Sequence, residues 1–327
     1  MDMLISVLLF AVGLVLLIKG GDWFVDGATG IAKRFHLPDI VVGATVVSIG
    51  TTLPEVMVST TGALAGSGAM AYGNAIGSII CNTALIAAIS ITVNPGPVNV
   101  KSMKTPAIFF FASAAMYCLA AYGLGTFPRW MGFVMLAVFV AYTLLTVRNG
   151  LKNPDTAEEE EEEEGGKERK LWQELLLLVI GAAVIAVGAD LLVDHGQIIA
   201  IGLGVPETVV ALLFVALGTS LPELVTTITS LKKGRASLGV GNVIGANVFN
   251  LVLVSGVAVS LAPFDVPVEN TLLNTGLNLS LVFDIPVMLG VMSLMIFPAL
   301  LGKKLSRWQG IALLCIYLAF VVCQFVL

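Results

Sequence analysis

The chain contains an internal repeat. Residues 20–82 align with residues 188–250 at a constant offset of 168, without a gap, and about a third of the aligned positions are identical. Both copies contain an acidic hexapeptide, Gly-Thr-Thr-Leu-Pro-Glu ending at Glu55 and Gly-Thr-Ser-Leu-Pro-Glu ending at Glu223. Two related apolar units in one chain restrict the fold to architectures in which the copies pack against each other.

The composition places both copies in a lipid bilayer. The 327 residues are 57% hydrophobic and 12% charged, about half the charged fraction of soluble domains. We therefore predict a multi-pass protein of the cell membrane whose partner is the bilayer, with no nucleic-acid partner and no obligate protein partner. The N-terminus lacks a basic segment and a cleavage pattern, so the first span is expected to be retained. Ten spans are expected at residues 4–32, 38–65, 70–93, 104–122, 127–147, 171–201, 206–231, 236–261, 282–300 and 307–326.

The basic residues test this number of spans. With the N-terminus outside, 15 of the 17 lysines and arginines fall in inner loops, and only Lys19 and Arg129 lie elsewhere. This alternation supports ten helices with both termini outside. Five spans separate equivalent elements, and an odd number inverts the second copy. The predicted fold is therefore an all-α integral membrane protein of ten transmembrane helices, arranged as two inverted-topology five-helix repeats.

An acidic stretch separates the two repeats. Residues 1–150 are expected to form the first repeat and residues 171–327 the second, joined by a cytoplasmic linker over residues 151–170. The linker contains seven consecutive glutamates, Glu158–Glu164. Like-charge blocks are usually solvated, so a disordered linker is favoured over a local attractor or sensor of cations.

A proline directly precedes each glutamate of the repeated motif and breaks the helix that carries it. Pro54 has no amide hydrogen to donate to the carbonyl of Gly50, so carbonyls from Ser48 onward are expected to point into a cavity. Thr51 and Thr52 add hydroxyl groups beside them. The stretch therefore combines freed carbonyls, two hydroxyls and one carboxylate.

The second copy, residues 216–223, repeats this arrangement with Ser220 in place of Thr52. Oxygen ligands without sulfur or imidazole suit hard cations, Ca²⁺ above all. Two carboxylates would neutralise one Ca²⁺, and Na⁺ could use the same oxygens. The alternative is a proline-kinked helix with a structural glutamate, and two mid-span copies disfavour it.

A second repeated element follows each acidic motif and has the pattern Gly-Asn-x-Ile-Gly. Ser78 and Asn82 lie four residues apart and project from one helix face. Asn82 and Asn250 can complete a coordination shell without adding charge. For Asn74 and Asn242, tight packing with interhelical amide hydrogen bonds is the favoured interpretation.

Four aspartates also repeat, nearer the ends of their spans than the middle: Asp22, Asp26, Asp190 and Asp194. Structural hydrogen bonding or a wet vestibule is favoured over ion ligation. Lys19 could pair with Asp22 across one helical turn. The four cysteines have no metal-binding spacing, so neither a metal cofactor nor a disulfide framework is expected.

These motifs resemble the sodium/calcium exchangers of the cation/calcium exchanger superfamily, specifically their prokaryotic type. The two alpha-repeats of that family match residues 42–82 and 210–250, and its ten-span inverted arrangement matches the whole chain. The resemblance implies a transporter rather than an enzyme, no cofactor, and transported Ca²⁺ alternating with several Na⁺. It also implies central shared ligands at Glu55 and Glu223, with Thr51 and Thr219 beside them. Further oxygens would come from Thr52, Ser220, Ser78, Asn82, Asn250 and the carbonyls of Ser48 and Ala216.

The sequence departs from the family pattern at two positions. Ala246 replaces a serine found in many members, so the Na⁺ subsite that mirrors that of Ser78 loses a hydroxyl. Asn250 stands where several members carry aspartate, including potassium-dependent ones, which makes potassium dependence less favoured. Both departures leave the ion stoichiometry open.

The sequence thus favours a Na⁺/Ca²⁺ antiporter that extrudes Ca²⁺ by alternating access, driven by the Na⁺ gradient. H⁺/Ca²⁺ antiport, K⁺-dependent Na⁺/Ca²⁺ antiport and a passive cation channel are the transport alternatives. An intramembrane aspartyl hydrolase built on Asp22 and Asp190 is disfavoured, because the Gly-x-Gly-Asp signature is absent and the glutamates would have no role.

Overall fold

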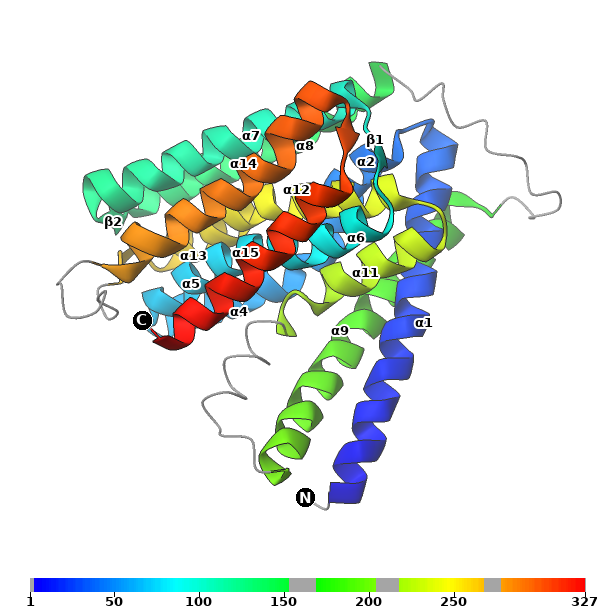
Figure 1. Cartoon of the computed structure of the whole chain (residues 1–327), viewed down its shortest axis with the longest axis horizontal. Coiled ribbons are helices and arrows are strands. Elements are labelled where there is room, and N and C mark those ends of the chain that lie inside the picture. The colour runs from blue at the N-terminus through cyan, green and yellow to red at the C-terminus, as the bar shows by residue number, and fades with distance from the viewer. Residues whose placement is uncertain (1–2, 153–168, 204–217, 268–277, 327) are drawn as a thin grey trace.

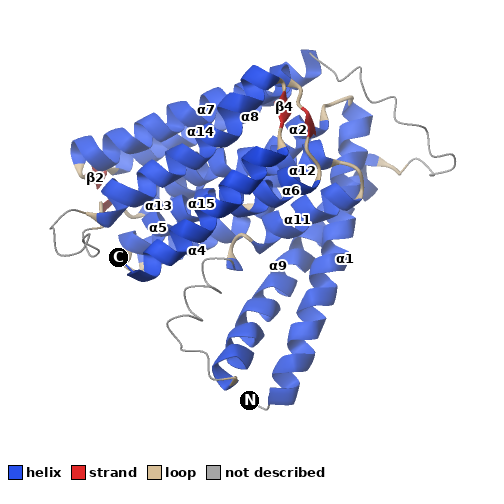
Figure 2. Ribbon diagram, viewed as in Figure 1, coloured by secondary structure: helices blue, strands red, loops and turns tan. Residues whose placement is uncertain are grey.

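The computed structural model describes residues 3–152, 169–203, 218–267 and 278–326. Within these ranges the chain is almost entirely helical, as Figures 1 and 2 show. The elements of the first half are α1 (Met3–Phe35), α2 (Asp39–Val42), η1 (Gly43–Val47), α3 (Ser48–Thr51), α4 (Leu53–Leu64), α5 (Gly68–Cys81), η2 (Asn82–Ala87), α6 (Ala88–Val93), β1 (Gly96–Pro97), α7 (Val100–Cys118), η3 (Leu119–Leu124), β2 (Thr126–Phe127) and α8 (Arg129–Lys152). Those of the second half are α9 (Leu171–Gly202), α11 (Leu221–Lys232), α12 (Ala236–Phe249), η4 (Asn250–Val254), α13 (Ser255–Leu261), β3 (Phe264–Asp265), η6 (Ser280–Asp284), α14 (Ile285–Gly302), β4 (Lys304–Leu305) and α15 (Arg307–Val326). The η elements are π-helical.

The described helices agree with the predicted spans. Eight are long and apolar enough to cross a membrane, and the bent pair Asp39–Thr51 and Leu53–Leu64 adds a ninth if it is one span. The predicted span 206–231 lies partly outside the described residues, and its described part contains α11. The acidic run 158–164 lies outside them entirely.

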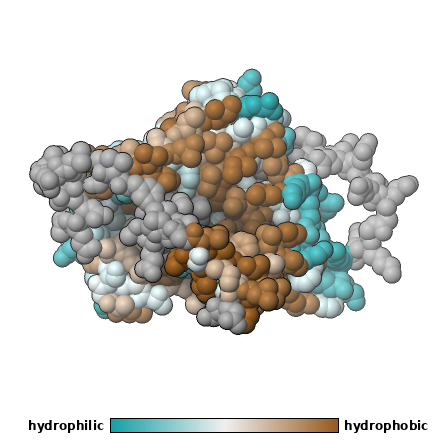
Figure 3. All heavy atoms as spheres, turned by 60° about the horizontal axis from the view of Figure 1, so that its bottom comes forward, coloured by the Kyte–Doolittle hydropathy of each residue, from teal (hydrophilic) through white to brown (hydrophobic). Residues whose placement is uncertain are grey.

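Two spans form the centre of the bundle. In the continuous helix Ala236–Leu261, 89% of the most apolar window is buried, and in Gly68–Val93 the share is 72%. The outer spans α1 and α9 bury only 22% of theirs. Apolar side chains cover the middle of the face seen in Figure 3, with polar residues at its margins. A lipid-facing exterior around closely packed central helices is the arrangement expected in a bilayer.

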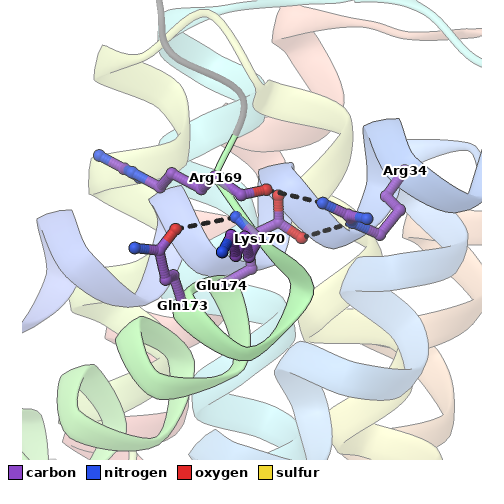
Figure 4. Close-up of polar contacts among 5 residues, drawn as sticks. All are labelled: Arg34, Arg169, Lys170, Gln173 and Glu174. Atoms are coloured by element: carbon purple, nitrogen blue, oxygen red, sulfur yellow. Dashed lines mark hydrogen bonds and ion pairs between the residues drawn. The ribbon is translucent and has the colours of Figure 1, made fainter.

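Helices α1 and α9 pack along each other and extend away from the rest of the bundle (Figure 1). Glycines allow the close approach: a Cβ on Gly13 would lie 2.9 Å from the carbonyl oxygen of Gly188, and one on Gly181 would lie 2.6 Å from the amide nitrogen of Phe24. The C-terminal end of α1 and the N-terminal end of α9 are tied together (Figure 4), where Arg34 Nε lies 3.3 Å from Glu174 Oε2. Arg34 Nη2 also donates to the carbonyl of Arg169 at 2.6 Å.

Two short antiparallel sheets link the halves. Strand β1 pairs with β4, with Gly96 opposite Leu305, and β2 pairs with β3, with Thr126 opposite Asp265. Each sheet joins one strand from the first half to one from the second. The segment 261–282 contains β3 and the start of η6, and its residues 268–277 lie outside the described ranges.

Candidate cation site

The repeated acidic motif interrupts its helix in both halves. Helix α3 ends at Thr51 and α4 begins at Leu53, with a 45° bend between them. Thr52 at the break has φ −86° and ψ −1°, and its equivalent Ser220 has φ −88° and ψ 4°. In each half the proline is the second residue of the new helix, where its missing amide hydrogen costs no intrahelical bond. The same local sequence therefore gives the same local conformation twice.

The two glutamates of the motif are completely buried. Glu55 and Glu223 have 0% exposure, and none of their four carboxylate oxygens has a hydrogen-bond partner in the described part of the chain. The two motifs meet in the structure, because α11, which carries Glu223, contacts α3 of the first copy. A pair of buried, unpartnered carboxylates is strongly unfavourable unless a cation or protons neutralise it.

Further unpartnered polar atoms belong to the residues predicted to surround these carboxylates. The hydroxyls of Thr52 and Ser220 and both side-chain polar atoms of Asn82 and Asn250 are buried without a partner among the described residues. Asn82 and Asn250 are each the first residue of a π-helical segment, η2 and η4, and π-helical turns are frequent at functional sites. Helix α4 contacts η4, and α11 contacts η2, so each glutamate helix meets the asparagine segment of the opposite half.

These donors fit a hard cation. With the carboxylates they provide up to eight oxygens, and Ca²⁺ takes six to eight oxygen ligands. The described residues contain no group of three or more His, Cys, Asp or Glu side chains able to hold a metal ion. Any cation held here would therefore rely on two carboxylates supplemented by neutral hydroxyl and amide oxygens.

Other predicted ligands are already hydrogen-bonded. Thr51 Oγ1 donates to Asn242 Oδ1 at 3.1 Å, and Thr219 Oγ1 donates to Asn74 Oδ1 at 3.4 Å. Each hydroxyl keeps lone pairs for a cation. Ser78 is buried on α5, one turn before the first residue of η2.

The carbonyl of Ser48 differs from the expectation. It still accepts a hydrogen bond from the amide of Thr52 at 3.0 Å, because the interruption begins only after that turn. One lone pair of this carbonyl is therefore engaged in the helix rather than directed into a cavity. The equivalent Ala216 lies outside the described residues.

Three aspartates of the first half pair with basic residues of the second half. Lys233 Nζ lies 2.6 Å from Asp26 Oδ1 and 3.6 Å from Asp22 Oδ1, so Asp22 pairs with this lysine rather than with Lys19. Arg235 binds the carboxylate of Asp39 at 3.1 Å. These pairs agree with a structural role for the first aspartate pair.

The structure adds polar partners that the sequence did not single out. Asn242 Nδ2 donates to Thr226 Oγ1 at 3.0 Å, and Asn74 Nδ2 donates to Ser59 Oγ at 2.8 Å. A signal for these partners exists, because each glutamate is followed by a Ser or Thr one helical turn later. Asn247, which donates to Thr83 Oγ1 at 2.7 Å, has no such signal because its repeat equivalent is Ile79.

Comparison with known proteins shows the same architecture in exchangers. The family model described as "Sodium/calcium exchanger protein" matches residues 5–148 and 174–326. The chain is 33% identical over 309 residues to the uncharacterized membrane protein MJ0091 of Methanocaldococcus jannaschii, covering 94% of each chain. It is 29% identical to the sodium/calcium exchanger MaX1 of Methanosarcina acetivorans, covering 98% of this chain and 99% of that protein.

A solved structure of the sodium-calcium exchanger NCX_Mj, soaked with zero Na⁺ and Ca²⁺, superposes with a TM-score of 0.80 at 30% sequence identity. The match covers 99% of this chain and 100% of the other. This similarity confirms the predicted all-helical, inverted-repeat membrane fold. The chain is a transporter rather than an enzyme, and it belongs to the sodium/calcium exchanger family.

Proposed function

We propose that this protein exchanges Na⁺ for Ca²⁺ by alternating access, with Glu55 and Glu223 as the shared ligands. The observation that carries this proposal is the burial of both carboxylates at interrupted helices, with all four oxygens unpartnered within the described residues. A divalent cation between them would cancel their charge. Two ions that require the same carboxylates exclude each other, and this competition couples their fluxes.

The assignment of individual ligands belongs to the proposal. Glu55, Glu223, Thr51 and Thr219 would serve both ions. Na⁺ would also use the hydroxyls of Thr52, Ser220 and Ser78, with Asn82, Asn250 and the carbonyls of Ser48 and Ala216 completing the set. Structures of NCX_Mj were obtained after soaking with Na⁺ together with Ca²⁺ or Sr²⁺, which supports this ion pair for a relative of the same fold.

Alternating access would use the outer helix pair. Helices α1 and α9 pack extensively with each other, and their lipid-exposed surfaces leave few contacts to rearrange. Sliding of this pair along the core would expose the site first on one side and then on the other. The division into repeats 1–150 and 171–327 fits this movement, since each repeat contributes one sliding helix.

A transport assay tests the proposal. Purified protein in Na⁺-loaded liposomes should accumulate ⁴⁵Ca²⁺ when external Na⁺ is low, and collapse of the Na⁺ gradient should stop uptake. Uptake that ignores Na⁺ but follows a pH gradient would instead establish H⁺/Ca²⁺ antiport. A strict need for K⁺ would establish the potassium-dependent reaction, and uptake without stimulation by ions on the opposite side would establish a channel.

The membrane orientation is proposed from the basic loops, with both termini outside. A fluorescent protein that matures only in the cytoplasm can be fused to the C-terminus or inserted after residue 160. Fluorescence is expected from the insertion and not from the terminal fusion. The reverse pattern would contradict the orientation.

A further inference from the structure

We propose that Asn242 and Asn74 are positioning residues that orient the ligand hydroxyls of Thr51 and Thr219 across the interface between the repeats. This inference rests on the proposed function, because it concerns the same cation site. Neither asparagine belongs to the proposed ligand set. Each acts through the hydroxyl of the opposite repeat.

The first part of the argument is a directed chain of hydrogen bonds around Asn242. Thr226 Oγ1 donates to the carbonyl of Pro222 at 2.8 Å, with the carbonyl of Glu223 at 3.1 Å. Because a hydroxyl has a single hydrogen, the oxygen of Thr226 can only accept from Asn242 Nδ2, which lies 3.0 Å away. The amide orientation is thereby fixed, and Asn242 Oδ1 faces Thr51.

The consequence for Thr51 is chemical. Its hydroxyl hydrogen is committed to Asn242 Oδ1 at 3.1 Å, so the lone pairs of its oxygen face away from Asn242. A cation requires lone pairs and is repelled by a hydroxyl hydrogen. Without the asparagine, the hydroxyl could rotate and donate to a glutamate, which would oppose cation binding.

The same arrangement recurs in the other half with the roles exchanged. Asn74 Nδ2 donates to Ser59 Oγ at 2.8 Å and to the carbonyl of Glu55 at 3.2 Å, and its Oδ1 accepts from Thr219 at 3.4 Å. Each asparagine thus connects the glutamate-bearing helix of its own repeat to the ligand threonine of the other. A packing role alone would not require both amide ends to be directed in this way.

The two links are unequal. Thr51, Asn242 and Thr226 are at most 2% exposed, whereas Asn74 and Thr219 are half-buried and their hydrogen bond is longer. Hydrogen bonds in a water-free environment are electrostatically stronger. Helices α2, η1 and α3 are held tightly to α12 at the buried link, where Ser48 Oγ lies 2.8 Å from the carbonyl oxygen of Gly43 and 2.9 Å from that of Asn242. Asn242 is therefore expected to have the larger effect.

The test is a double-mutant cycle read out by equilibrium ⁴⁵Ca²⁺ binding to the purified protein, with Na⁺ competition measured in parallel. Asn242→Ala and Thr51→Val should each weaken Ca²⁺ binding about tenfold, the lower end of the range for partners that orient metal ligands. The double variant should bind like either single variant, because Asn242 acts through the Thr51 hydroxyl. Additive losses, or unchanged affinity in Asn242→Ala, would overturn the inference.

Asn247→Ala is the matched control, because Asn247 is equally buried on the same helix but donates to Thr83 and to Met292 Sδ. Its Ca²⁺ affinity should stay within about twofold of the unmodified protein, even if the loss of this buried hydrogen bond lowers its thermal stability. If Asn242→Ala does not fold, the same cycle with Asn74→Ala and Thr219→Val, at half-buried positions, decides the question. Failure of the unmodified protein to bind Ca²⁺ would contradict the proposed function, which distinguishes that outcome from failure of the positioning role.

Discussion

At the residue scale, the charges of the proposed ligands Glu55 and Glu223 would determine which ions the site can hold. Glu55→Gln and Glu223→Gln preserve size and remove one negative charge each, so a bound Ca²⁺ would no longer be neutralised. Both variants are expected to lose Na⁺-dependent ⁴⁵Ca²⁺ uptake, while elution as a single species in size-exclusion chromatography shows that they fold. Robust exchange in both variants would show that the ligands lie elsewhere.

The two Na⁺ subsites are expected to be unequal, because Ser78 on α5 corresponds to Ala246 on α12. Ser78→Ala removes the remaining hydroxyl of this pair and should raise the half-saturating Na⁺ concentration several-fold, with a smaller effect on Ca²⁺. Ala246→Ser is the reciprocal variant and should lower the half-saturating Na⁺ concentration. Both are measured as Na⁺ dependence of Ca²⁺ efflux, and equal Na⁺ dependence in all three proteins would refute a role for this position.

Which residues the sequence could identify depends on the range of the interactions involved. Glu55 and Glu223 stand out because a charge within an apolar run is costly wherever the run packs. The hydrogen bond from Thr51 to Asn242 could not be predicted, because the two residues are 191 positions apart in the sequence and meet only through the packing of their helices. The Ser48 carbonyl was expected to be free, but Pro54 removes only the bond to the carbonyl of Gly50, and the Ser48 carbonyl two residues earlier still accepts from Thr52.

At the element scale, the two halves make different contacts despite their similar sequences. Helix α11 packs against both α1 and α9, with Val225 and Thr229 beside Gly21, whereas its repeat equivalent α4 has no comparable packing on either helix in the described residues. Lys233 at the end of α11 then pairs with Asp22 and Asp26. In the proposed orientation this contact lies on the inner side of the molecule, where it would hold the end of α11 against α1.

The Lys233 contact has no counterpart on the other side. The position equivalent to Lys233 is the exposed Ala65, and Asp190 and Asp194 have no ion pair within the described chain. Lys233→Ala should therefore favour the state open to the inside, and Ala65→Lys should favour the opposite state. Exposed ion pairs contribute at most about 1 kcal/mol, so each population should change by no more than about fivefold.

These populations can be compared through the apparent Ca²⁺ affinities of the inner and outer faces in vesicles of defined orientation. Lys233→Ala should strengthen the apparent affinity at the inner face relative to the outer face, and Ala65→Lys should weaken it. Lys232→Ala is a suitable control, because the neighbouring Lys232 forms none of the ion pairs of Lys233. The same ratio in all four proteins would show that the ion pair does not bias the conformation.

At the scale of the whole molecule, the inverted repeat explains how one sequence supports two states. The prolines and glutamates of the acidic motif and several glycines occupy equivalent positions in the two halves, so much of each half can adopt the contacts that its equivalent makes here. The spans and their inversion could be predicted because hydrophobicity and basic loops act independently of packing. The relative placement of the two halves could not be predicted, because the two similar sequences make different contacts in any one state of the protein.

The acidic run Glu158–Glu164 concerns the whole molecule, because it belongs to the linker between the two repeats and not to the proposed cation site. Replacing all seven glutamates by serine should leave the maximal rate and the half-saturating Ca²⁺ unchanged at 0.15 M salt, where charges are screened within about 8 Å. The proposed site lies near the middle of a hydrocarbon layer about 30 Å thick, well beyond that distance.

Uptake is measured from the cytoplasmic face at about 0.15 M and 0.01 M salt, because screening extends to about 30 Å at the lower concentration. An increase of several-fold in half-saturating Ca²⁺ at 0.15 M salt would identify the run as a cation attractor. A change confined to low salt would instead reflect its long-range field, and the antiport cycle would then depend on the ten spans alone.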